Sequence, residues 1–450
     1  MPTSIIDSSY FKDMYGSERM HALFCDEARF QGWLDFEAGL ARAQARLGII
    51  PQAAADEISA RAKVEYLDVT AMKEEFDRVG FPIGPLVHQL ARAVSTQTSR
   101  YVHWGSTTQD VIDSGMALQM RNGLDLLDEM LGDLETVLAS LAERYRDTLM
   151  VGRTMQQQAA PITFGYKVAI WLAEVHRHRE RLHSMRPRVL VGQVAGAVGT
   201  NATLGDRGLD VLRETMLELG LSEAPITWHV ARDNWTEVTT LLAMVGATMA
   251  KFGLEVALLM RTEVGEVGEP YVAGRGASST LPQKRNPIVC QPLIAAGRML
   301  REKAALAFDT MVQEHERGVG GMHLEWSLLP EAFVLAGGAI ENALSILDGL
   351  VVNEARMAAN LDLLNGMVMS EAVMMGLAPH LGRNQAHDVV YAACARCADG
   401  KLSLREALLE DERISSNLSG AQIDAMLDPA RYLGCAPAMV DRVLALVRRA

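Results

Sequence analysis

The sequence predicts an all-α fold of three helical domains with a central bundle of long helices. Aromatic residues make up only 6% of the 450 residues, whereas alanine, leucine and methionine are abundant, and this composition favours helix over sheet. The middle third of the chain has apolar residues at every third or fourth position, which is typical of amphipathic helices. At roughly 150 residues per domain, the length also corresponds to about three domains.

The two outer domains are expected to consist of short helices. In residues 1–110, charged helical segments are interrupted at Pro51, Pro82 and Pro85. In residues 351–450, short helical segments are again separated by turns, such as the one at Gly382. We therefore expect both ends of the chain to form compact helical caps.

The central domain, residues 111–350, is predicted to contain the long helices. One runs from Asp113 to Arg146, where proline is absent and leucine or methionine recurs at spacings of three and four. The others are expected at about residues 161–183, 235–264, 287–310 and 330–350. The longest of these would measure about 37–50 Å. Several have apolar residues on more than one face, which favours helices shared between subunits over the thick core of a monomer.

The charge balance excludes some classes of partner. Lys plus Arg number 43 and Asp plus Glu 56, so the net charge of −13 argues against a protein that binds nucleic acid or an anionic membrane. No stretch resembles an export signal or approaches the roughly 20 apolar residues of a membrane span. The five scattered cysteines predict reduced thiols in a cytoplasmic protein, and Cys394 and Cys397 are expected to pack in a helix rather than bind metal.

The segment with the strongest chemical character is the loop predicted at residues 271–287. Its first half is rich in glycine and alanine, as expected for a mobile loop. Ser278 and Ser279 lie close in sequence to Lys284, and Asn286-Pro287 has the pattern of an N-cap and a first helical residue. Free N–H groups at that helix start would favour an oxyanion or a carboxylate. An ordinary linker into a capped helix fits the composition equally well.

Three segments resemble the conserved regions of the fumarase/aspartase superfamily. Residues 278–287, Ser-Ser-Thr-Leu-Pro-Gln-Lys-Arg-Asn-Pro, resemble its signature loop, with Leu281 in place of the usual methionine. Residues 101–110 (Tyr-Val-His-Trp-Gly-Ser-Thr-Thr-Gln-Asp) resemble its first region, and residues 152–161 (Gly-Arg-Thr-Met-Gln-Gln-Gln-Ala-Ala-Pro) its second. Stretches along the whole chain are most similar to the 3-carboxy-cis,cis-muconate cycloisomerase family and more distantly to adenylosuccinate lyase.

The resemblance implies how the signature loop works. Ser278 would be the general base that removes, or in reverse returns, a proton beside a carboxylate. Lys284 and Asn286 would bind that carboxylate and stabilise the dianionic intermediate. A carbon acid next to a carboxylate is very weak, so stabilisation of the developing charge should be the largest catalytic term. A serine base also needs a depressed pKa, which a closed, cation-rich loop can supply.

The resemblance also implies the assembly and the remaining contacts. Thr107 and Thr108 would bind a carboxylate from the first region, and Gln157 would contact the substrate from the second. The fold would be L-aspartase-like, a homotetramer with a multi-helix core. Each active site would take its three segments from three different chains and bind a small di- or tricarboxylate. No cofactor and no metal are expected.

Other polar residues are candidates from the sequence itself. Ser279 adjoins the predicted base, and Arg317 is placed either on a substrate carboxylate or in an ordinary ion pair. His103 and His88 either face the substrate or pack against the backbone. His315 and His323 lie in a glycine-rich stretch predicted as loop, where no HExxH pattern supports a metal site. The basic run that contains His176, His178 and His183 is expected on a solvated helix face. The loop at 191–200 lacks the GxGxxG spacing of a dinucleotide site and is expected near the active site.

Met155 distinguishes this chain from amine-releasing relatives. Those relatives commonly place a histidine there as the general acid, and many carry a second histidine at the position of Gln158. Methionine cannot transfer a proton, so release of an amine would need a substitute acid. In lactone formation a carboxylate attacks an alkene and no acid is needed at that oxygen. Met155 therefore favours cycloisomerisation, or elimination of another stable anion.

Three hypotheses of function follow. The first is a cycloisomerase that converts 3-carboxy-cis,cis-muconate to a carboxymuconolactone in aromatic catabolism. The second is a fumarate-releasing lyase of the adenylosuccinate or argininosuccinate type, acting on a substituted succinate or an N-substituted aspartate. The third is a non-catalytic helical scaffold, against which the intact Ser278, Lys284 and Asn286 argue.

Overall fold

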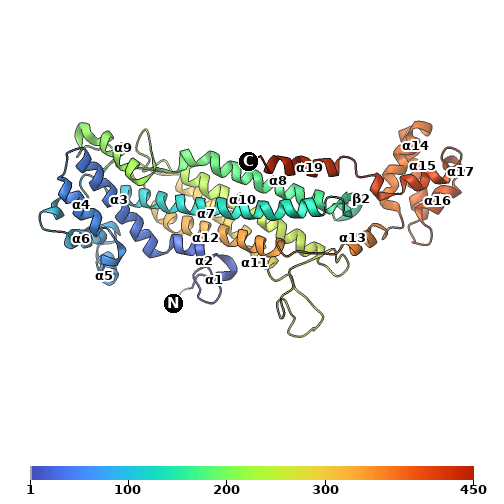
Figure 1. The fold of residues 1–450 in the computed structure, drawn as a ribbon, viewed down its shortest axis with the longest axis horizontal. Helices are drawn as coiled ribbons and strands as arrows, with labels where there is room; N and C mark the ends of the chain where they lie inside the picture. The colour runs from blue at the N-terminus through green and yellow to red at the C-terminus, as the bar shows by residue number, and fades with distance from the viewer. Residues whose placement is uncertain (1–2, 450) are drawn as a thin grey trace. The chain divides into compact units, whose positions relative to one another are not determined.

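The computed structural model describes residues 3–449, and this part of the chain is mostly helical (Figure 1). The predicted all-α class is therefore confirmed. The long helices are α3 (Asp26–Arg46), α7 (Thr108–Arg144), α8 (Phe164–Val189), α10 (Asp233–Leu259), α11 (Cys290–Thr310) and α12 (Gly321–Leu347). The shorter helices before α12 are α1 (Lys12–Tyr15), α2 (Glu18–Phe24), α4 (Gln52–Arg61), α5 (Val69–Val79), α6 (Ile83–Ala93) and α9 (Gly208–Leu219). Those after it are α13 (Glu354–Leu361), α14 (Ser370–Leu381), α15 (Arg383–Arg396), α16 (Leu404–Glu410), α17 (Glu412–Ser415), α18 (Gly420–Met426) and α19 (Ala436–Val447).

Short strands pair in three two-stranded sheets within the described residues. The largest is the antiparallel hairpin of β1 (Leu149–Thr154) and β2 (Gln157–Thr163), which has a register shift between Val151 and Arg153. The parallel pair is β3 (Val191–Gly192) with β4 (Ser222–Glu223), and the other antiparallel pair is β5 (Val267–Gly268) with β6 (Val351–Val352).

The chain packs as two compact units. Unit 1 comprises residues up to 131, 178–250 and 292–342, and unit 2 comprises residues 132–177, 251–291 and from 343 onward. Helices α1–α6 and α9 lie in unit 1, whereas the β1–β2 hairpin and α13–α19 lie in unit 2. The division into domains at 110 and 350 stays a prediction.

In unit 1, close packing of α3 against α7 depends on two glycines. A Cβ atom on Gly32 would lie 3.2 Å from the carbonyl oxygen of Gly115, and one on Gly115 would lie 2.6 Å from a ring carbon of Trp33. The absence of side chains here lets the two backbones approach, and α3 buries Leu34 and Phe36 in the same core. The start of α7, which carries the first predicted site region, is thereby held on a rigid support.

The long-helix predictions are partly confirmed. Helix α7 covers the predicted segment almost completely, but the helix expected from residue 161 begins only at Phe164 because residues 157–163 pair with β1. Helix α8 also continues past the predicted end at residue 183 to Val189 and includes Pro187. The glycine-rich stretch at 318–323 was predicted as loop, yet α12 begins at Gly321 and includes Pro330. Most side chains of α12 after Pro330 are buried, and such packing overrides local propensity.

In unit 2, the C-terminal helices α14–α18 have their own apolar core. Val373, Leu377, Val389 and Leu408 are buried there together with Cys397, and Cys394 packs against them. The prediction that these two cysteines pack is confirmed, but only Cys394 lies in a helix, because Cys397 is the residue that follows the end of α15.

Helix α10 is long and apolar enough to cross a membrane by length and composition alone. Half of its most apolar window is buried within the described part of the chain, which is typical of a core helix in a soluble protein. The same helix leaves Met244 and Leu254 exposed, so part of its apolar surface is uncovered in the single chain.

Candidate active site

The first predicted region lies in unit 1, in the loop that leads into α7. Thr107 precedes the helix, and Thr108 is its first residue. Asp110 lies in the first turn and accepts the backbone N–H of Thr107 at 3.0 Å, while its own N–H bonds to the Thr107 carbonyl. This reciprocal arrangement closes the helix start and fixes the backbone that carries Thr107.

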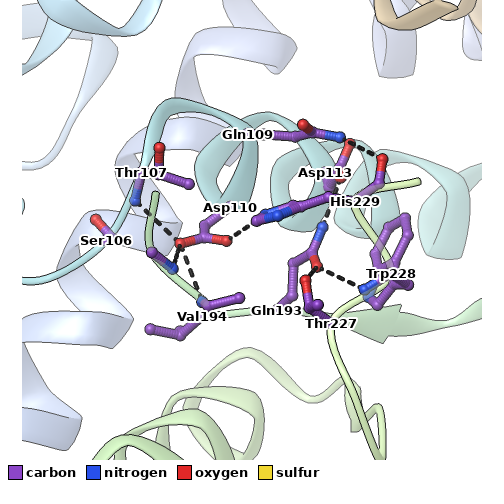
Figure 2. Close-up of polar contacts among 12 residues, drawn as sticks. Ser106, Thr107, Gln109, Asp110, Asp113, Gln193, Val194, Thr227, Trp228 and His229 are labelled. Carbon is purple, nitrogen blue, oxygen red and sulfur yellow. Dashed lines mark hydrogen bonds and ion pairs between the residues drawn. The ribbon is translucent and has the colours of Figure 1, made fainter. Parts of the chain in front are cut away.

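Asp110 connects this helix start to two other segments, as Figure 2 shows. Its Oδ2 also accepts the N–H groups of Ala195 at 3.1 Å and Gly196 at 3.0 Å, and its Oδ1 lies 2.9 Å from Nε2 of His229. The carboxylate is fully buried, and His229 is 1% exposed. A buried carboxylate is stable only when its oxygens are satisfied, so the three segments are tied to one charge.

A second buried charged group on α7 is Asp113, one turn after Asp110, and its partner is Arg232. Arg232 is fully buried and makes paired hydrogen bonds to Asp113 at 2.9 and 3.0 Å and to Glu325 at 2.7 and 2.7 Å. Its guanidinium lies 4.9 Å from the ring centre of Trp228 and 4.0 Å from that of Trp235. Burial raises the pKa of Glu325 although Arg232 opposes that shift. This ion network joins α7 and α12 to the start of α10.

Arg317 meets the first region directly. Its Nη1 donates to Oγ1 of Thr107 at 3.4 Å, and its Nη2 donates to the carbonyl of Ala197 at 3.1 Å. Arg317 is exposed and has no carboxylate partner among the described residues. Its cation is therefore available to an anionic ligand next to Thr107.

His103 is fixed by a buried acid. Nδ1 lies 2.6 Å from Oε1 of Glu37 and 3.0 Å from Oγ of Ser106, and the backbone of His103 is left-handed with φ of 59°. Burial opposes the charged imidazole, but the Glu37 carboxylate outweighs it and raises the pKa of His103 above its usual value. His103 therefore adds a second positive group near Thr107 over a wider pH range than an ordinary histidine.

The second predicted region forms the β1–β2 hairpin in unit 2. Thr154 pairs with Gln157, so Met155 and Gln156 form a two-residue turn, and their φ angles of 49° and 65° are both left-handed. Met155 is 95% exposed, and Gln157 is also exposed. Gln158 instead turns inward and donates to the carbonyl of Asn360 at 3.1 Å. The hairpin therefore presents its tip, including Met155 and Gln157, to solvent.

The signature loop follows β5 in unit 2 and extends away from the helices (Figure 1). Oγ of Ser278 accepts the backbone N–H groups of Leu281 at 3.1 Å and Thr280 at 3.3 Å. Two donors aimed at one hydroxyl oxygen favour its negatively charged form. The loop is closed at its base, where the backbone N–H and the side-chain Nδ2 of Asn286 both donate to the carbonyl of Gly276.

The cations of the loop are not neutralised within it. Residues 271–287 contain Arg275, Lys284 and Arg285 and no acidic residue. The guanidinium of Arg285 lies 4.7 Å from the ring centre of Tyr271. Lys284 and Ser279 are exposed, and the Lys284 ammonium has no hydrogen-bond or ion-pair partner in the described part of the chain. This small segment therefore concentrates positive charge on a protein of net charge −13.

One expectation for this loop was wrong. Helix α11 begins at Cys290, not at Pro287, and its first N–H groups are not free. The carboxylate of Glu269 accepts the N–H groups of Ile288, Val289 and Cys290 at 2.9 to 3.1 Å. An internal carboxylate thus occupies the anion site that the helix start would otherwise offer. Burial and this neighbouring carboxylate also raise the pKa of the Cys290 thiol, which makes it inert.

The structure groups the predicted residues into three segments. Thr107, Thr108, His103 and Arg317 come together in unit 1. Ser278, Ser279, Lys284 and Asn286 share one loop in unit 2, and Gln157 lies on a separate hairpin of that unit. Among the described residues, no hydrogen bond joins Gln157 to the loop.

The sequence reasoning missed the groups that hold these segments. The role of Asp110, the last residue of the 101–110 segment, was not predicted. A threonine followed three positions later by an acid, as Thr107 is by Asp110, is a helix-start pattern that would have indicated it. Glu269, His229 and Arg232 carry no local pattern, because their partners come from distant parts of the sequence.

The remaining histidines have ordinary partners or none of catalytic character. His88 pairs with Glu75 at 2.6 Å on the surface. The prediction that the basic run lies on a solvated helix face is wrong for two of its histidines. His176 is buried against Glu135, and His178 is buried against Thr248. The described residues contain no group of three or more metal-binding side chains, and His323 packs against the ring of Trp326.

Comparisons with known proteins agree with this fold. Residues 15–299 match the family described as Lyase, and residues 366–443 match the family described as Adenylosuccinate lyase C-terminus. The chain is 45% identical to 3-carboxy-cis,cis-muconate cycloisomerase of Pseudomonas aeruginosa, over 99% of this chain and 97% of that protein. It is 38% identical to N-acetyl-S-(2-succino)cysteine lyase of Dickeya dadantii, over 99% of this chain and 98% of that protein.

The solved structures give the same result. The crystal structure of 3-carboxy-cis,cis-muconate lactonizing enzyme from Pseudomonas putida matches with a TM-score of 0.92 at 40% identity, over 98% of this chain and 99% of that one. The chain therefore belongs to the fumarase/aspartase superfamily. It is an enzyme of the lyase or cycloisomerase type.

Proposed function

We propose that this enzyme is a cofactor-free cycloisomerase that converts 3-carboxy-cis,cis-muconate into a carboxymuconolactone in aromatic catabolism. The observation that carries the proposal is the exposed hairpin turn, where neither Met155 nor Gln156 can donate a proton. When a lactone opens, the leaving group is a carboxylate, a stable anion that needs no proton. An amine leaving group, in contrast, must receive a proton as it departs. The 45% identity to a cycloisomerase over nearly the whole chain supports the same assignment.

The signature loop supplies the proton chemistry of this proposal. In the direction of lactone formation, a substrate carboxylate oxygen bonds to one alkene carbon, and the displaced electron pair moves to the neighbouring carbon and its carboxylate. Lys284 and Asn286 stabilise the resulting dianion, and the Ser278 hydroxyl transfers its proton to that carbon. The serine oxygen is left negative, a form that the N–H groups of Thr280 and Leu281 favour. The reverse reaction uses Ser278 as the base.

The unit 1 residues bind the other carboxylates. Arg317 and protonated His103 supply positive charge beside Thr107, and the Thr107 and Thr108 hydroxyls supply neutral donors. Hydrogen bonds between charged groups are stronger than those between neutral ones, so the cations set affinity and the hydroxyls set orientation. Ser279 and Gln157 add exposed polar contacts from the other two segments.

The site is completed by assembly into a homotetramer, in which segments from three chains meet. The support is the uncovered apolar surface of α10, together with site segments whose side chains are exposed in the single chain. Burial of that surface against other copies of the chain would provide the hydrophobic driving force for association.

The decisive experiment follows the ultraviolet absorbance of 3-carboxy-cis,cis-muconate, because lactone formation removes the conjugated diene. The purified wild-type protein is expected to abolish this absorbance and produce a carboxymuconolactone, identified by mass and nuclear magnetic resonance. Unchanged absorbance at micromolar enzyme and saturating substrate would refute the proposal.

A second function is favoured by one observation. The 38% identical lyase of Dickeya dadantii is named for a succinyl thioether, and a thiolate is also a stable anion that leaves without an acid at position 155. This alternative is an elimination that releases fumarate from a substituted succinate. Assays for fumarate with succinyl thioethers and N-substituted aspartates distinguish this alternative from the cycloisomerase. Because the hairpin lacks a proton donor, we expect fumarate release from the thioethers but not from the aspartates.

A further inference from the structure

We infer that Asp110 is a positioning residue that sets the carboxylate-binding geometry of Arg317 and Thr107. This inference rests on the proposed function only in assigning a carboxylate ligand to those two residues. The relevant contacts all lie within unit 1.

The first step is that the carboxylate of Asp110 binds several groups that come from different segments of the chain. The two oxygens of Asp110 accept three backbone N–H groups and lie within hydrogen-bond distance of one histidine nitrogen, and all of these contacts measure 2.9 to 3.1 Å (Figure 2). Hydrogen bonds to an ionised acceptor are roughly twice as strong as neutral ones. The carboxylate is therefore the point at which the helix start and the loop at 195–196 are fixed to each other.

The second step is that Arg317 rests on both fixed segments. One guanidinium nitrogen donates to Thr107 Oγ1, and another donates to the carbonyl of Ala197, the residue after the two N–H groups that Asp110 holds. Arg317 itself is exposed and has no acid to orient it among the described residues. The direction of its guanidinium thus depends on two acceptors whose separation Asp110 determines.

The third step is that packing alone does not hold the loop. Residues 192–195 and 199–201 line a cavity of about 410 Å³, so one side of this segment faces space instead of side chains. Gly196 and Gly199 have left-handed φ angles of 76° and 85°, conformations that leave the segment free to adopt other shapes once its hydrogen bonds are lost. Hydrogen bonds therefore hold the segment: Asn201 bonds to Val194 and Ala195, and Asp110 ties Ala195 and Gly196 to the helix start at Thr107.

Positioning and simple stabilisation predict different results in a double-mutant cycle of Asp110→Asn and Arg317→Gln. Asp110→Asn keeps the size of the side chain and removes its charge, and we expect kcat/KM to fall by about tenfold or more, mainly through KM. In the Arg317→Gln background, the same change should cost less than about threefold, because the charged one of the two groups it positions is already absent. Equal losses in both backgrounds would overturn the inference.

The matched control is Glu135→Gln, which removes another buried carboxylate of α7, bonded to His176 and 25 residues later in the sequence, in unit 2. It should leave KM unchanged even where it lowers stability. If Glu135→Gln raises KM as much as Asp110→Asn does, the effect is one of general stability and the inference is wrong.

Two measurements keep this test independent of the proposed function. Calorimetric binding of tricarballylate, a saturated tricarboxylate that cannot form the lactone, gives the same cycle as dissociation constants. Hydrogen exchange followed by mass spectrometry should show faster exchange in the peptide that contains Ala195 and Gly196 in Asp110→Asn only. A wild-type enzyme that binds tricarballylate but converts no substrate refutes the function alone. Unchanged tricarballylate affinity and unchanged exchange in Asp110→Asn refute the positioning role.

Discussion

The Asp110 and Arg232 network of unit 1 is buried, whereas the signature loop of unit 2 is exposed. In the network, both carboxylate oxygens of Asp110 and all the guanidinium nitrogens of Arg232 have partners, so the Thr107 region is fixed before any ligand arrives. The loop around Ser278 bonds within itself, as where Asn286 meets Gly276, and its end is held where Glu269 caps α11. Under the proposed function, we expect the unit 1 part to be a preformed receptor for carboxylates and the signature loop to close on a bound substrate.

The largest effect is expected from Ser278→Ala. Removing the proposed acid-base group should lower kcat by about 10²- to 10⁴-fold without changing the free energy of unfolding, because the side chain makes only local contacts. Steady-state kinetics and urea unfolding measure the two quantities. A stability loss as large as that of a buried residue would break the contrast between loop and network.

The next effect concerns stability. Arg232→Leu leaves Asp113 and Glu325 as buried carboxylates without a cation, and we expect it to lower the free energy of unfolding by about 3–5 kcal/mol. Burial already raises the pKa of Glu325, so protonation of this stranded carboxyl group should shrink the loss at low pH. The exposed pair of Arg405 and Asp424 is the control, and breaking it should leave the free energy of unfolding in urea nearly unchanged. If the two variants lost similar amounts of unfolding free energy, the buried cluster around Arg232 would not depend on its charges more than a surface ion pair does.

The smallest effect is a pH dependence of stability in Glu37→Gln. Glu37 raises the pKa of His103 in the folded chain, so its contribution is complete below the unfolded histidine pKa and is lost as the pH rises through the raised value. The free energy of unfolding of Glu37→Gln should therefore lie furthest below that of the wild type near pH 5 and approach it at pH 9. A difference that stays constant from pH 5 to pH 9 would show that His103 is not protonated.

The features predicted from the sequence were those with local signals. The apolar spacing from Asp113 onward predicted α7, and the serine, lysine and asparagine of the signature loop were identified from their motif. The hairpin was missed because residues 157–163 become a strand only through pairing with 149–154. The burial of His176 and the capping by Glu269 also depend on partners that lie 41 and about 20 residues away, where no spacing rule applies.

The left-handed turn at Met155 and Gln156 affects which residues can occupy the tip of the hairpin. Methionine gains nothing from this backbone conformation, whereas histidine, like asparagine, adopts it several-fold more often than most residues. A single change to histidine would therefore fit the hairpin of the single chain, in which Met155 is almost fully exposed. One substitution of low conformational cost would thus place a proton donor at the tip of this hairpin.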